Sequence, residues 1–175
     1  MQRLLFFVLA LLFVNISLGG ASINPYELKG VMIQRIATFI EWPACPKENV
    51  SVAVYDDQAS YEKFKKVFSS VNFANKEVTI RNIASLNDVA TLSPCDILYL
   101  GNASSAERAK IIEKIGKKGV LIIGSTREDA KIGAGVVLME DSQRYKILVN
   151  TDALKYANLK ADYRLLKLAE IVETK

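Results

Sequence analysis

Apolar residues near the start of the chain recur at spacings of three and four, the period of one face of a helix. This stripe begins after Tyr26 and comprises Leu28, Val31, Met32, Ile36, Phe39 and Ile40. Pro43 cannot continue a helix and disfavours helical geometry at the preceding residue, so the helix is expected to end near Glu41. Trp42, the only tryptophan, is then expected to plug one end of the core at this joint.

Beyond Pro46 the pattern changes to short β-branched runs that alternate with helical runs, which is typical of a largely parallel sheet. Two of these runs are apolar almost throughout, as strands covered on both faces are, and the second of them is expected to be central. The predicted strands are Val50–Tyr55, Glu77–Arg81, Asp96–Leu100 and Gly119–Gly124; the predicted helices are Ser60–Phe68 and a helix from the Ser104–Glu107 capping box to Ile115.

The next two apolar runs, Gly135–Met139 and Arg144–Val149, are separated by residues 140–143 only. A crossover helix does not fit in that gap, whereas an antiparallel hairpin at the edge of the sheet does.

The remaining residues read as helical. Asn150 or Thr151 is expected to cap a short helix through Tyr156, and Ala161–Val172 is expected to form a last helix with one apolar face. The whole pattern predicts an α/β fold in a single domain, with a mixed, mostly parallel sheet of about six strands, helices on both faces and a C-terminal antiparallel hairpin.

Residues 1–21 have the pattern of a secretory signal peptide, with Arg3, the apolar run Leu4–Val14 and small residues at the exit. We therefore expect a signal peptide at 1–21, a single domain at 22–175, and the periplasm as destination. The alternative is an uncleaved anchor, because Leu4–Ala21 is almost long enough to span a bilayer.

Composition narrows the possible chemistry. The net charge is +4 with both signs well mixed, and no polybasic tract carries aromatic residues, so nucleic acid is a poor candidate partner. Histidine is absent, which excludes Ser-His-Asp, Cys-His and His-based zinc sites. The glycine-flanked run 119–124 lacks the lysine of a phosphate loop, and no GxGxxG is present. We expect no catalytic residues, no metal site and no cofactor.

Cys45 and Cys95 form an even pair in a chain expected to be exported, the setting in which thiols become disulfides. Each precedes a predicted strand, so parallel strands would place both at the same edge of the sheet. A disulfide between them is the favoured reading. The alternative is two unpaired residues, with Cys95 buried and Cys45 exposed.

The carboxyl ends of the predicted parallel strands are where ligands collect in open sheets. They carry Tyr55–Asp57, Gly101–Ser104 and Gly124–Arg127, and helix N-termini there can hold an anion with Arg127 assisting. The favoured interpretation is nevertheless that these are ordinary turn and cap residues, and that Asp56 and Asp57 are a solvated turn rather than a metal or acid–base pair.

The chain resembles the YfiR-like family of periplasmic regulators. The resemblance rests on the ordered phrases Phe39–Pro43, Cys95–Leu100, Asn150, Leu159 and Leu165–Ala169. It implies a mixed α/β fold, often a homodimer, with no catalytic activity. It also implies that the protein binds the periplasmic part of an inner-membrane diguanylate cyclase and holds it inactive, thereby controlling cyclic-di-GMP. The chain departs from the family pattern at Leu159–Tyr163 and at Cys45.

Recognition of such a partner is expected near the last hairpin and the last helix. The candidate partner-binding residues are Glu140, Tyr145, Ile147 and Arg164, with the Glu41-Trp42-Pro43 motif as a nearby support. The alternative function, from a different class, is a periplasmic sensor module that binds a small molecule in the crevice at the strand ends.

Overall fold

The computed structural model of the chain describes residues 24–42, 49–69, 77–94, 96–141 and 144–174. The expected signal peptide, Pro43 of the Glu41-Trp42-Pro43 motif, Cys45 and Cys95 all lie outside the described residues. The signal peptide and the disulfide therefore stay predictions.

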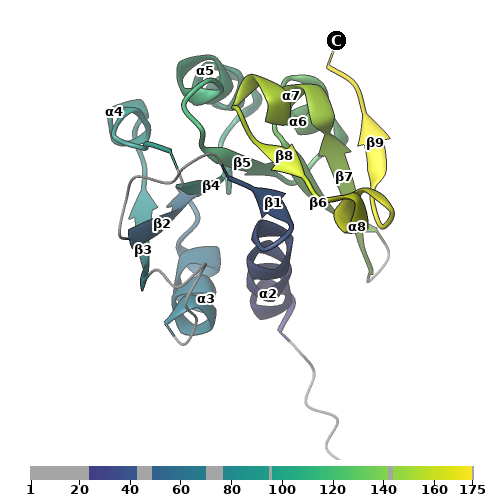
Figure 1. Cartoon of the computed structure of the whole chain (residues 1–175). Coiled ribbons are helices and arrows are strands. Elements are labelled where there is room, and N and C mark those ends of the chain that lie inside the picture. Colours follow the sequence, from purple (N-terminus) through teal and green to yellow (C-terminus); the bar gives the residue numbers. More distant parts are fainter. Residues whose placement is uncertain (1–23, 43–48, 70–76, 95, 142–143, 175) are drawn as a thin grey trace, which may run out of the picture.

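A seven-stranded sheet with the order β3-β2-β4-β5-β6-β7-β9 forms the centre of the molecule (Figure 1). Neighbouring strands from β3 to β6 are parallel, β6 and β7 form an antiparallel hairpin, and β9 adds parallel to β7. The strands are β2 Asn49–Tyr55, β3 Glu77–Ile83, β4 Ile97–Tyr99, β5 Leu121–Gly124, β6 Val136–Asp141, β7 Arg144–Asn150 and β9 Glu170–Val172. The mixed, mostly parallel α/β sheet and the central position of β5 are confirmed.

Helices cover both faces of this sheet, as predicted (Figure 1). One core lies between the sheet and the helices α2 and α3. Successive residues of a strand point to opposite faces of the sheet, so Val52 belongs to this core and Leu98 to the core on the other face. The second core lies beneath α4, α5 and α6. The helices are α2 Pro25–Ala37, α3 Gln58–Phe68, α4 Leu86–Ala90, α5 Ser105–Ile115, α6 Arg127–Lys131, α7 Thr151–Tyr156 and α8 Tyr163–Leu166.

The first helix ends earlier than the sequence suggested. α2 stops at Ala37, and Ile40–Glu41 form the short strand β1, which pairs antiparallel with β8, Lys160–Ala161. Pro43 disfavours helical geometry only at the residue directly before it, so it does not explain why the helix ends at Ala37. The backbone of residues 40 and 41 leaves the helix because it forms hydrogen bonds with β8 instead. Trp42 is partly buried against the core, and its Nε1 donates to the carbonyl of Ala37 at 3.3 Å.

The predicted last helix, Ala161–Val172, is wrong. This stretch forms the end of β8, the single turn of α8 and the strand β9. Its apolar residues do not share one environment, because Leu165 is 1% exposed while Leu168 is 72% exposed. Residues 170–172 instead pair with β7, so β9 and not the hairpin forms this edge of the sheet.

Asn150 fixes the junction between β7 and α7, as predicted. It is fully buried; its Oδ1 accepts from the backbone N–H of Ala153 at 2.8 Å, and its Nδ2 donates to the carbonyl of Ala130 at 2.7 Å and to Oγ1 of Thr174 at 2.8 Å. One side chain therefore ties α7, α6 and the segment that follows β9 together.

We expect Asn150→Ala to lower the free energy of unfolding by about 2 kcal/mol, because it removes a helix cap and leaves the Ala130 carbonyl without its donor. Urea unfolding followed by circular dichroism measures the change. The matched control is Ser85→Ala, which removes the partly exposed cap of α4 and is expected to cost about 1 kcal/mol or less. Equal losses in the two variants would contradict this role of Asn150.

Candidate functional site

A crevice of about 840 Å³ opens at the carboxyl ends of β2, β4 and β5, the edge at which the sequence analysis weighed a ligand site against ordinary turn and cap residues. The predicted loops supply Asp56, Asp57, Gly101, Asn102 and Ser125 to its wall. The structure adds side chains that the sequence analysis missed, from α2, α3, β3 and β4: Tyr26, Lys29, Gln58, Ala59, Asn82 and Tyr99. No local pattern marks Lys29 or Tyr99, since their nearness depends on α2 packing over the strand ends.

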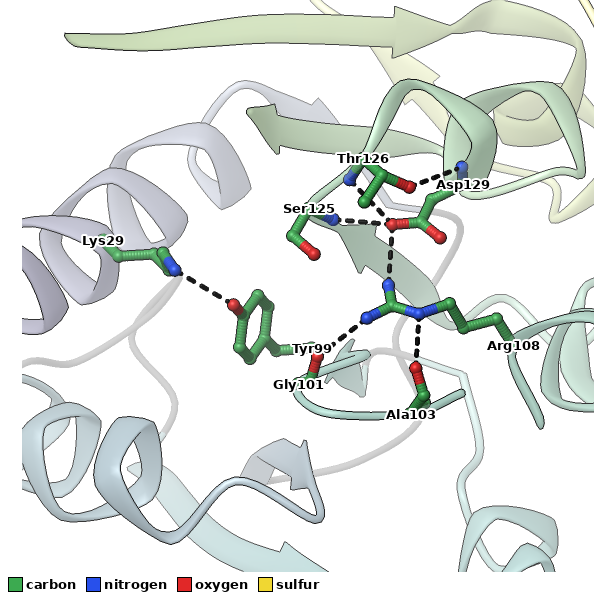
Figure 2. A network of polar contacts seen from close by, with 8 residues as sticks. All are labelled: Lys29, Tyr99, Gly101, Ala103, Arg108, Ser125, Thr126 and Asp129. Carbon is green, nitrogen blue, oxygen red and sulfur yellow. Dashed lines mark hydrogen bonds and ion pairs between the residues drawn. The ribbon is translucent and has the colours of Figure 1, made fainter. Parts of the chain in front are cut away.

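A buried ion pair between Arg108 and Asp129 holds the loops that supply Gly101 and Ser125 to the crevice wall (Figure 2). Asp129 is 1% exposed, and its Oδ2 accepts from Arg108 Nη1 at 2.7 Å and from the backbone N–H groups of Ser125 and Thr126 at 2.8 Å each. The same guanidinium donates to the carbonyls of Ala103 at 2.7 Å and Gly101 at 2.8 Å. The loops after β4 and β5 are thereby locked together.

Two glycines make this arrangement possible. A Cβ at Gly124 would collide with the side chain of Asp129, and Gly101 has a φ of +46° with its backbone against the Tyr55 carbonyl. Asp129 also closes a capping box with Thr126 at the start of α6. The short segment between β5 and α6 is therefore shaped around one carboxylate.

Lys29 reaches from α2 to the Tyr99 hydroxyl, to which its Nζ donates at 3.1 Å (Figure 2). The ammonium also lies 5.5 to 5.9 Å from the ring centroids of Tyr99, Tyr26 and Tyr145, within the range of cation–π attraction. Burial raises the pKa of Tyr99 well above its ordinary value, so this hydroxyl is neutral at physiological pH. Lys29 forms no ion pair with any residue in the described part of the chain.

The two adjacent acids at the end of β2 do different things. Asp57 is buried and caps α3, accepting from the N–H of Ser60 at 2.9 Å and from its hydroxyl at 2.6 Å. Asp56 is exposed, with a φ of 46°, and its backbone is fixed by bonds to the Ile83 carbonyl and from the Asn102 amide. Its carboxylate hydrogen bonds to no other described residue.

Arg127, which the sequence analysis considered as a helper for a bound anion, is not among the residues that line the crevice. Its guanidinium forms two hydrogen bonds, at 2.6 and 2.7 Å, to the carboxylate of Glu170 on β9. The unpredicted strand brings this carboxylate next to α6, and the bidentate pair holds the arginine at the sheet edge.

The structure brings three of the four candidate partner-binding residues together. Glu140 and Tyr145 lie directly opposite each other in the β6–β7 ladder, and Ile147 follows on the same face. We call these three residues the hairpin face. The Tyr145 hydroxyl donates to the carbonyl of Pro25 at 3.3 Å, so the hairpin face adjoins the first turn of α2 and lies beside Lys29.

Arg164 lies at the other end of α2. Its guanidinium stacks 5.0 Å from the ring of Phe39 and bonds the carboxylate of Asp162 at 2.9 and 3.0 Å. A second hollow, of about 640 Å³, lies in this region and is lined by Glu41, Trp42 and residues of α7, β8 and α8; Glu41 pairs with Lys160 at 3.0 Å.

The geometry defines a single-domain α/β protein with a polar crevice at its strand ends. Among the described residues no group of three or more Cys, Asp or Glu side chains is placed to hold a metal ion.

The chain belongs to the YfiR/HmsC-like family, whose model matches residues 26–170. Members of this family are periplasmic regulatory proteins that act with membrane signalling proteins. No helix in the described ranges is long and apolar enough to cross a membrane.

The fold is similar to a crystal structure of a conserved domain protein from Vibrio cholerae O1 biovar El Tor str. N16961. The TM-score is 0.59 and the sequence identity 13%, and the match covers 86% of this chain but 60% of the Vibrio chain. This likeness supports the fold alone.

We expect Arg108→Met to lower the free energy of unfolding by about 3 kcal/mol, because it leaves the buried Asp129 carboxylate without its counter-charge. Arg127→Met is the matched control; it breaks an ion pair whose side chains are 43% and 49% exposed and is expected to cost less than about 1 kcal/mol. Urea unfolding of both variants measures the difference. A loss in Arg108→Met no larger than in the control would show that the network does not hold the crevice.

Hydrogen bonds from Arg164 lower the pKa of the Asp162 carboxyl to about 2. Because the folded pKa lies below the unfolded one, the stabilisation is complete above the ordinary pKa of 3.8 and is lost as pH falls through 2. We expect Arg164→Ala to raise this pKa towards the ordinary value of aspartate, because the side-chain hydrogen bonds are lost while the backbone N–H of residue 164 still donates to the carboxylate. Carbon-13 NMR titration of the side-chain carboxyl measures it, and an unchanged midpoint would contradict the pairing.

Proposed function

We propose that this protein is a non-enzymatic periplasmic regulator that binds and represses the periplasmic sensor part of an inner-membrane diguanylate cyclase, thereby controlling cyclic-di-GMP. The observation that carries the proposal is membership of the YfiR/HmsC-like family over residues 26–170. In this role the domain acts by occupying a surface of its partner, so its own exposed side chains determine recognition.

The hairpin face and Arg164 are the proposed partner-binding surface. Glu140 and Arg164 are exposed, while Tyr145 and Ile147 are partly buried against the core, so charged and apolar groups are presented on fixed backbone. The hairpin face and Arg164 lie at opposite ends of α2, whose 13 residues separate them by about 20 Å. One interface of ordinary size covers such a distance. The tyrosine and the arginine are residue types enriched at interface hot spots.

A homodimer belongs to the same proposal. Tyr163, Leu168 and Ile171 in the last described segment are 64%, 72% and 49% exposed, which supports an interface there. The proposed Cys45–Cys95 disulfide would tie the domain to the oxidising environment of the periplasm and make partner binding sensitive to reduction.

The second candidate function is a sensor module that binds a small molecule. The observation that favours it is the crevice itself, which is preformed, polar and contains the half-buried Lys29 without an ion-pair partner among the described residues.

The test is a pull-down of the mature protein from solubilised envelopes of its own cell, run oxidised and reduced and read by mass spectrometry. We expect recovery of a membrane protein with a cyclase domain. Glu140→Lys and Arg164→Glu are each expected to lower the amount recovered at least about tenfold. The charge-matched controls on α5 are Glu113→Lys and Lys114→Glu, both exposed on the opposite side of the sheet.

Unchanged recovery with Glu140→Lys and Arg164→Glu would show that the surface is wrong. Recovery of no membrane partner in either redox state would overturn the regulator proposal and favour the sensor module. Loss of the partner only on reduction would identify Cys45 and Cys95 as a redox switch.

A further inference from the structure

We propose that the crevice at the strand ends binds a small zwitterion, with its anionic group at Lys29 and its ammonium group at Asp56. Both side chains line the crevice of about 840 Å³, one from α2 and the other from the loop after β2. Lys29 bonds the Tyr99 hydroxyl, and neither side chain forms an ion pair with the other or with any other described residue, so two opposite charges line the same crevice without an ionic partner.

Lys29 is prepared to receive an anion. One of its three N–H donors bonds the Tyr99 hydroxyl, which leaves two donors available. The tyrosine rings around the ammonium stabilise its charge while they exclude water from part of its surface. A charge-assisted hydrogen bond in such a partly desolvated place is stronger than one in open solvent.

Asp56 is prepared to receive an ammonium group. Its backbone N–H donates to the Ile83 carbonyl at 2.8 Å, and its own carbonyl accepts from the Asn102 side chain at 2.9 Å. The origin of its side chain is therefore fixed, and the carboxylate itself bonds no described residue. The other acid in the crevice, Asp57, is already used as the cap of α3.

The neighbouring amides complete the match. The side-chain NH₂ groups of Asn102 and Asn82 donate to Asp56 and Gln58, at 2.9 and 2.8 Å, so each amide leaves its carbonyl oxygen as an acceptor. These acceptors suit the N–H donors of an ammonium group. A ligand with a single negative charge would meet Asp56 as a repulsive neighbour, and one with a single positive charge would meet Lys29, so the crevice selects for a dipolar molecule.

The loops after β4 and β5 are already held by Arg108 and Asp129, beside the point where Lys29 meets Tyr99 (Figure 2). Binding therefore does not have to order these loops, which lowers the free-energy cost of capturing a small ligand.

The test is a nitrogen-15 NMR titration of the mature chain with ω-amino acids of increasing length: glycine, β-alanine, 4-aminobutyrate and 5-aminopentanoate. The series measures the separation of the two charges that the crevice prefers. We expect one length to bind best and to shift the backbone amides of Gly101, Asn102 and Ser125. Butyrate and butylamine, which carry one charge each, are expected to bind at least about tenfold more weakly.

Lys29→Met and Asp56→Asn are each expected to weaken the best-binding zwitterion about tenfold. Methionine keeps the apolar stem between the tyrosine rings, and asparagine tolerates the positive φ at residue 56, so both variants retain the fold, as their spectra will show. Lys65→Met, on the exposed part of α3, is the control and is expected to change nothing.

Absence of amide shifts at tens of millimolar of every ω-amino acid would overturn the proposal. So would butyrate or butylamine binding as tightly as the best zwitterion, or unchanged binding in Lys29→Met. The site does not depend on the regulator proposal, because the two sets of variants are read in different assays: Glu140→Lys and Arg164→Glu in the pull-down, and Lys29→Met and Asp56→Asn in the titration.

Discussion

The buried carboxylate of Asp129 is the constraint on which the strand-end half of the structure depends. An unpaired carboxylate at 1% exposure would be strongly destabilising, so the chain must deliver donors to it from elsewhere. Arg108 comes from α5 and the N–H groups of Ser125 and Thr126 from the next loop, which fixes both loops against each other. The absence of a side chain at Gly124 follows from the same requirement. The rigid crevice is thus a result of satisfying one charge.

Most of the fold was predictable from sequence because its signals are local. The apolar strand 121–124, the Ser104–Glu107 capping box and the Asn150 cap are each encoded within a few residues, and the structure confirms them. The errors concern pairing between distant segments. Residues 40 and 41 leave the helix because residues 160 and 161 are there to pair with, and residues 170–172 become a strand because β7 offers an edge. Helical periodicity carries no information about such partners.

The candidate site was predictable only in part: its loops could be found from the sequence, but the side chains that reach it from distant elements could not. Topology alone places the ends of β2, β4 and β5 together, so the loops that carry Asp56, Asn102 and Ser125 were found. Lys29 lies on a helix that precedes the first strand of that sheet in sequence, and only the packing of α2 brings it to Tyr99. The actual partner of Arg127 was not foreseeable, because Glu170 lies on the strand that the sequence analysis missed.

The position of β9 has a consequence for how the chain reaches its final form. β7 gains its outer neighbour from residues that follow it by some twenty positions in the sequence, after α7, β8 and α8 have intervened. Until those residues arrive, Leu148 and Val149 belong to an open edge whose backbone groups can pair with any extended chain. A chain that is synthesised from its N-terminus passes through this stage every time it is made. The three residue pairs of β9 and the Arg127–Glu170 ion pair then close that edge, so this C-terminal strand protects the newly made domain against pairing with its neighbours.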